Sequence, residues 1–89
     1  MHLKYTFETV ELDNKIIAVP VGSDGSGFHG VIRLNETGAY ILDLLKQETT
    51  EEAIITAMKN EYDTPEENIA KDVHAYLERF REKDILVES

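Results

Sequence analysis

Apolar and polar residues alternate along the first third of the chain, a pattern typical of strands that are buried on one face. The segment Leu3–Leu12 begins with apolar residues at every second position. Turn residues, Asp13–Lys15, separate it from a short β-branched run, Ile16–Val21. A glycine-rich connection, Gly22–Gly27, leads to a third apolar segment, Phe28–Leu34. We therefore expect three strands in the order of a meander.

The rest of the chain shows the apolar spacing of three helices. The first is predicted to begin at Asn35, a favourable N-cap. The second is predicted to begin at Thr49, with Glu52 completing a capping box, and the third at Thr64, with Pro65 in its first turn. The expected buried stripes are Gly38, Ile41, Leu42 and Leu45; Ile54, Ile55, Met58 and Tyr62; and Ile69, Val73, Tyr76, Leu77 and Phe80.

This order of elements predicts an α+β fold, with a three-stranded antiparallel sheet followed by three α-helices. The length of 89 residues fits a single domain over positions 1–89, and 42% apolar residues suffice for a core. The last segment, Asp84–Glu88, is too short to assign, although it is compatible with a small closing strand. There is no cysteine, which excludes disulfides and thiolate metal sites.

The charge balance bears on the class of partner. Eighteen acidic residues face nine basic ones, for a formal net charge of −9. Because phosphate neutralisation by Lys and Arg supplies most non-specific affinity for nucleic acids, this balance weighs against a nucleic-acid partner. The chain shows neither an apolar run long enough to span a bilayer nor a signal-like start. We expect a cytoplasmic protein without a membrane partner.

No pattern of residues indicates catalysis. The three histidines, His2, His29 and His74, are scattered and lack metal-ligand spacing. The glycines of Gly22–Gly27 do not match a phosphate-binding loop. The glutamates at the predicted helix starts are explained by capping and by the helix dipole. We therefore expect no catalytic residue, no metal site, no cofactor and no enzymatic activity.

Several motifs, in order, resemble the PqqD-like family of standalone RiPP recognition elements, which act on ribosomally made, post-translationally modified peptides. The matching pieces are Leu34-Asn35, Thr37-Gly38 with Ile41-Leu42, Thr50 with Glu51-Glu52, Tyr62-Asp63, Asp72-Val73 with Tyr76-Leu77, and Ile85-Leu86. Together they extend over nearly the whole chain. Two glycines usual in the family are replaced here, one by the segment Lys46–Thr50 and the other by Asp84.

The resemblance implies a winged-helix-like fold and a role as a peptide-binding chaperone. Such domains capture the leader peptide of a precursor as an added strand on their third strand, beside the third helix. They then present the precursor to a modifying enzyme, in PqqD-like systems commonly a radical SAM enzyme, and hold no cofactor themselves.

The predicted meander agrees with this mode, because its third strand would be an edge with free backbone groups. Alternation places Ile32 and Leu34 on one face and Val31 and Arg33 on the other. Ile32 and Leu34 are equally well explained as core residues, and Asp72 as a locally bonded side chain. The candidate peptide-binding residues are Gly30, Val31, Ile32, Arg33 and Leu34 on the strand, and Asn68, Asp72, Ala75 and Arg79 on the third helix.

Two other functions remain open from the sequence. A winged-helix DNA-binding regulator shares the expected fold, but the third predicted helix lacks a basic face. An interaction module for some other protein, acting through the acidic surface, is the third possibility.

Overall fold

The computed structural model describes residues 1–21 and 30–88. The predicted connection Gly22–Gly27 and the first two residues of the predicted strand Phe28–Leu34 lie outside this described part. In chain order, the elements are β1 (His2–Leu3), β2 (Phe7–Leu12), β3 (Lys15–Pro20), β4 (Ile32–Leu34), α1 (Glu36–Leu44), α2 (Glu51–Glu61), α3 (Glu66–Glu82) and β5 (Leu86–Val87).

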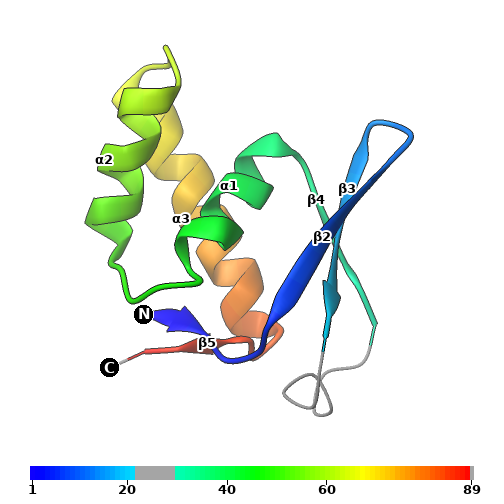
Figure 1. The fold of residues 1–89 in the computed structure, drawn as a ribbon. Coiled ribbons are helices and arrows are strands. Elements are labelled where there is room, and N and C mark those ends of the chain that lie inside the picture. The colour runs from blue at the N-terminus through cyan, green and yellow to red at the C-terminus, as the bar shows by residue number, and fades with distance from the viewer. Residues whose placement is uncertain (22–29, 89) are drawn as a thin grey trace.

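The fold is α+β, as predicted, with a three-stranded antiparallel sheet preceding three helices. The strand order is β2-β3-β4, so β3 is central and both β2 and β4 are edges. Figure 1 shows this sheet on one side of the molecule, with α1 between it and the other two helices. A second, two-stranded sheet joins β1 to β5 in antiparallel register, which brings the two ends of the chain side by side.

The first predicted strand is wrong in one respect, because the segment Leu3–Leu12 divides between the two sheets. The Leu3 amide donates to the Leu45 carbonyl (2.9 Å), and the Lys4 amide donates to the Ile85 carbonyl (2.7 Å). These bonds tie the start of the chain to the end of α1 and to the segment before β5, and the chain then turns into β2. The small closing strand that Asp84–Glu88 allowed is present as β5.

The third strand is shorter than predicted. Only Ile32–Leu34 pairs with β3, and Gly30 has a φ of +106°, which is outside the extended region. Gly30 and Val31 therefore precede β4. The buried side chains of Ile32 and Leu34 and the exposed side chains of Val31 and Arg33 confirm the predicted alternation.

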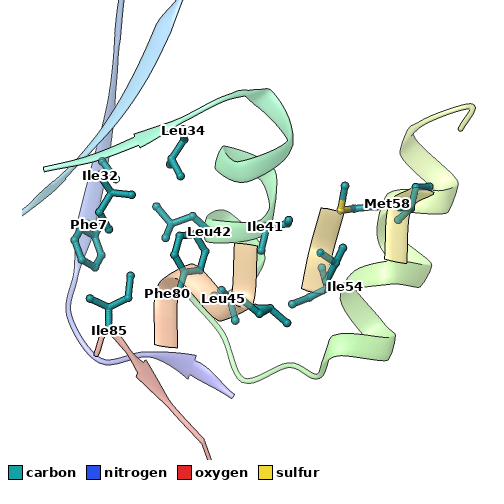
Figure 2. Close-up of a cluster of buried hydrophobic side chains, with 14 residues drawn as sticks. Phe7, Ile32, Leu34, Ile41, Leu42, Leu45, Ile54, Met58, Phe80 and Ile85 are labelled. Atoms are coloured by element: carbon teal, nitrogen blue, oxygen red, sulfur yellow. The ribbon is translucent and has the colours of Figure 1, made fainter. Parts of the chain in front are cut away.

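The core forms where the sheet meets the helices. Figure 2 shows side chains of β2 and β4 directed toward α1 and the end of α3, with α2 covering the far side. The residues of this cluster are Phe7, Ala18, Ile32, Leu34, Ile41, Leu42, Leu45, Ile54, Met58, Ile69, Val73, Leu77, Phe80 and Ile85. The predicted helical stripes are confirmed, except that Ile55, Tyr62 and Tyr76 are only partly buried. The core thus holds β4 in place through its two buried side chains.

Two of the three predicted helix starts are displaced by one residue. Asn35 caps α1 as predicted, since its side chain accepts a bond from the Gly38 amide (2.8 Å). The cap of α2 is Thr50 rather than Thr49, whose amide donates instead to the Met1 carbonyl. Thr64 does not cap α3. Its N-cap is Pro65, with an extended ψ of 140° and no side-chain cap bond.

The end of α3 is closed by a Schellman motif. The Ile85 amide donates to the Phe80 carbonyl, and the Asp84 amide donates to the Arg81 carbonyl. Asp84 takes the left-handed conformation that this motif requires, with a φ of +58°. Ile85 and Phe80 are both fully buried, which supplies the hydrophobic contact that accompanies the motif.

Candidate functional site

The phase of hydrogen bonding in β3 determines which backbone groups of the sheet remain free. Asp13–Asn14 forms a two-residue turn with positive φ at both positions (48° and 68°), as in a type I′ hairpin. In such a hairpin the flanking residues, Leu12 and Lys15, form a hydrogen-bonded pair. The Val21 amide donates to the Thr6 carbonyl (3.0 Å), which agrees with the same phase. The odd-numbered residues of β3 therefore bond to β2, and the even-numbered ones bond to β4.

This alternation of hydrogen bonds turns the backbone N–H and C=O groups of Arg33 away from β3. Arg33 lies opposite Ile17, an odd-numbered residue that bonds to β2, whereas Ile32 and Leu34 lie opposite even-numbered residues. Because both polar groups of a strand residue point to the same side, the Arg33 amide and carbonyl face outward. Ile32 and Leu34 bond inward to β3. Val31 lies two residues before Arg33, so the same alternation assigns its backbone groups to the outward side.

The side chain of Arg79, on α3, reaches this outward carbonyl. Its Nη2 atom donates to the Arg33 carbonyl oxygen at 3.4 Å, which is long for a hydrogen bond. This contact independently places the Arg33 carbonyl on the side of α3. The Arg79 guanidinium also lies over the Tyr76 ring, 5.2 Å from its centroid. The free edge of β4 therefore faces a cationic side chain held on α3.

Asn35 and Tyr76 connect α3 to the end of β4, and the sequence did not single out either as a site residue. The Asn35 Oδ1 atom accepts from the Gly38 amide (2.8 Å) and from the Tyr76 hydroxyl (2.7 Å). The Tyr76 ring lies so close to Gly38 that a Cβ there would be 2.5 Å from Cε1. The sequence placed Tyr76 in the buried stripe of its helix, and it gave no signal of this contact. We refer to Arg33, Asn35, Tyr76 and Arg79 as the β4–α3 surface.

The other predicted residues of α3 lie on the exposed side of the helix. Asn68, Asp72 and Ala75 are exposed and share one stripe with Arg79, at helical spacing. Within residues 1–21 and 30–88, no hydrogen bond or ion pair joins Asn68 or Asp72 to β4. Of the four predicted positions on this helix, the structure brings Arg79 to the strand edge.

Arg33 and Arg79 are cationic side chains that form no ion pair within the described part of this acidic chain. Among the described residues, ion pairs join Lys4 to Asp84, Lys46 to Asp43, Lys59 to Glu66, and Arg81 to Glu78 and Glu88. Lys15, Lys71 and Lys83 form none within that part of the chain. Among the described residues, no carboxylate lies within ion-pair distance of Arg33 or Arg79. The hydrogen bond that Arg81 donates to Glu88 raises the pKa of Arg81. The β4–α3 surface is thus a local cationic spot on a protein of net charge −9.

A hollow of about 550 Å³ lies elsewhere, between the β2–β3 hairpin and α1. Tyr40 and Tyr62 contribute to its wall, with their rings in an edge-to-face contact (centroids 5.8 Å apart). Burial, together with the charges of Glu36 and Glu61, raises the pKa of Tyr62.

The described residues contain no group of three or more side chains able to hold a metal ion, and no helix among them is long and apolar enough to cross a membrane.

The chain also matches a known protein family over the region that contains this surface. Residues 16–86 match the family model of coenzyme PQQ synthesis protein D, PqqD. The chain belongs to the PqqD family. The matched residues run from β3 to β5, and so they contain the whole β4–α3 surface. The resemblance that the sequence motifs indicated is confirmed. No curated protein matches the chain in sequence.

Two solved structures share the PqqD-family fold of this chain. A structure of TbiB1 in complex with the TbiA(beta) leader peptide superposes with a TM-score of 0.71 and 18% identity, covering 100% of this chain and 98% of that chain. A lasso peptide synthetase B1 complexed with the leader peptide superposes with a TM-score of 0.68 and 17% identity, covering 98% and 96%. At 18% and 17% identity, these two structures show that the chain shares their fold.

Proposed function

We propose that this protein captures the leader peptide of a ribosomally made precursor as an additional strand on β4. The observation that carries the proposal is the outward-facing backbone of Arg33, on an edge strand beside α3. A peptide in extended conformation gains its affinity from main-chain hydrogen bonds to such an edge. Gly30, Val31, Ile32, Arg33 and Leu34 would form its first wall, and Asn68, Asp72, Ala75 and Arg79 its second.

The family and the fold support the same function. The chain belongs to the PqqD family, and both similar structures are complexes with leader peptides. We propose that this chain likewise acts through binding, as a single domain without catalysis, and in the cytoplasm. Its partner would be an enzyme that modifies the precursor, for which a radical SAM enzyme is our proposal.

The alternative, a winged-helix DNA-binding regulator, finds little support on α3. A recognition helix enters the major groove with side chains that contact bases and phosphates. The exposed side of α3 includes Glu67, Asp72, Glu78 and Glu82, which would repel phosphates.

The proposed function is tested by titrating the purified protein with short peptides encoded beside its gene, each synthesised without its C-terminal half. We expect one of them to bind saturably in calorimetry, and its binding to slow hydrogen exchange at the Arg33 amide. Absence of binding by every such peptide, together with saturable binding of duplex DNA, would contradict the proposal.

A further inference from the structure

We propose that Arg79 makes this protein selective for peptides that carry an aspartate or glutamate next to the residue that pairs with Arg33. The inference rests on the strand-addition function proposed above and adds the chemistry of the peptide. It follows from three features of the β4–α3 surface: the carbonyl to which Arg79 donates, the way its guanidinium is held, and the absence of a carboxylate partner for Arg79 among the described residues.

Arg79 occupies the acceptor that an added strand needs. A peptide paired with Arg33 must donate a backbone N–H to the Arg33 carbonyl, where Arg79 Nη2 now donates at 3.4 Å. Because this bond is long and exposed, its loss costs little. The bound peptide therefore competes with the guanidinium for this carbonyl, and a displaced guanidinium has no other hydrogen-bond acceptor among the described residues.

The displaced guanidinium stays at the edge of the new strand. It lies over the ring of Tyr76, 5.2 Å from the centroid, and this contact does not involve β4. Tyr76 is itself fixed, because its hydroxyl donates to Asn35 Oδ1 (2.7 Å) and its ring lies against Gly38. Arg79 is therefore pre-positioned beside the peptide, where its planar fork matches a carboxylate better than a neutral acceptor.

The surrounding charge makes this selection specific to one position. The net charge of −9 repels an acidic peptide from most of the surface. Within residues 1–21 and 30–88, Arg79 has no carboxylate partner to compete with the peptide. A single acidic residue is thus favoured where it meets Arg79 and disfavoured elsewhere along the strand.

The experiment uses a displayed library of random fifteen-residue peptides, selected in parallel on the wild-type protein and on Arg79→Gln and Arg79→Glu variants. We expect wild type to enrich Asp or Glu at one position of the selected peptides. The Arg79→Gln variant should lose this enrichment, and the Arg79→Glu variant should enrich Lys or Arg at the same position. An acidic peptide selected on wild type should bind Arg79→Gln about tenfold more weakly.

Lys71→Glu is the matched control, because Lys71 is exposed on the same helix and has no ion pair among the described residues. Like Arg79→Glu, it replaces a cationic side chain of α3 by glutamate, but at a distance from β4. Peptides selected on Lys71→Glu should therefore still be enriched in Asp or Glu at the same position. Enrichment of peptides with no acidic position, or identical enrichment on wild type and Arg79→Glu, would overturn the role of Arg79 while peptide binding stands. If folded wild type enriches no peptide at all, both this inference and the proposed function fail.

Discussion

Asp84 stands at a backbone position that favours glycine. Its φ of +58° is required by the Schellman motif that ends α3, and the family usually has a glycine before its closing leucines. Aspartate tolerates the left-handed region better than most residues, and its side chain also accepts from Lys4 Nζ (3.1 Å). The departure from the family pattern thus keeps the loop geometry of the motif.

We predict an order of stability at this position. Asp84→Gly removes the strain of the left-handed conformation and loses only an exposed ion pair, so it should stabilise the protein by about 0.5 kcal/mol. Asp84→Ala should destabilise it by about 1 kcal/mol, because alanine has no polar group to compensate a positive φ. Urea denaturation midpoints should therefore rank Gly above Asp and Asp above Ala. A midpoint for alanine equal to or above that of aspartate would contradict the assigned conformation.

The three threonines near the helix starts give a second prediction at the residue scale. Thr50→Ala removes the cap bond to the Ala53 amide (3.1 Å) and should cost about 1 kcal/mol of stability. Thr49→Ala and Thr64→Ala should each cost less than about 0.5 kcal/mol, because neither side chain caps a helix. Thermal denaturation of the three variants checks this ranking. A loss from Thr64→Ala as large as that from Thr50→Ala would show that α3 begins at Thr64.

These threonines also show how far sequence reasoning reaches. Adjacent threonines satisfy the same capping pattern, and the choice between Thr49 and Thr50 depends on a bond from Thr49 to the distant Met1 carbonyl. In the same way, the alternation of β4 was visible in the sequence, whereas its short length was not. The contact from Arg79 to β4 joins residues 46 positions apart, and so no local pattern could show it.

At the scale of elements, Gly38 allows α1 and α3 to approach each other at the end of β4. A Cβ at this position would be 2.5 Å from the Tyr76 ring, closer than side-chain atoms approach. The Thr-Gly pair that carries the family resemblance therefore has a packing explanation. The glycine makes room for the tyrosine that supports Arg79.

We predict that the effect of Gly38→Ala depends on the Tyr76 ring. In the wild-type background the substitution should destabilise the protein by about 1–3 kcal/mol, through steric overlap with the ring. In a Tyr76→Ala background it should be neutral or stabilising, because alanine favours a helix more than glycine does. A double-mutant cycle by denaturant unfolding measures the difference. Equal effects in both backgrounds would show that the two residues do not contact each other.

At the scale of the whole molecule, the charge distribution separates peptide binding from DNA binding. The net charge of −9 opposes phosphates, and the two arginines of the β4–α3 surface are too few to neutralise a duplex. We predict no binding of random duplex DNA in gel shifts at physiological salt. A shift at micromolar protein that weakens steeply as salt is raised would contradict this prediction.

The central claim is that a peptide pairs with the outward backbone of Arg33. The same hydrogen-bonding phase that turns Arg33 outward on β4 turns Thr9 outward on β2, the opposite edge. A proline at either position removes an outward N–H and leaves the bonds to β3 intact. The two substitutions therefore make a matched pair, and Arg33→Ala controls for loss of the arginine side chain.

The most direct measurement is calorimetric titration of a peptide that binds the wild-type protein into Arg33→Pro, Thr9→Pro and Arg33→Ala, with circular dichroism to verify folding. We expect all three variants to fold, and only Arg33→Pro to lose affinity, by about tenfold or more. Folded Arg33→Pro that binds the peptide as tightly as wild type would contradict strand addition at β4.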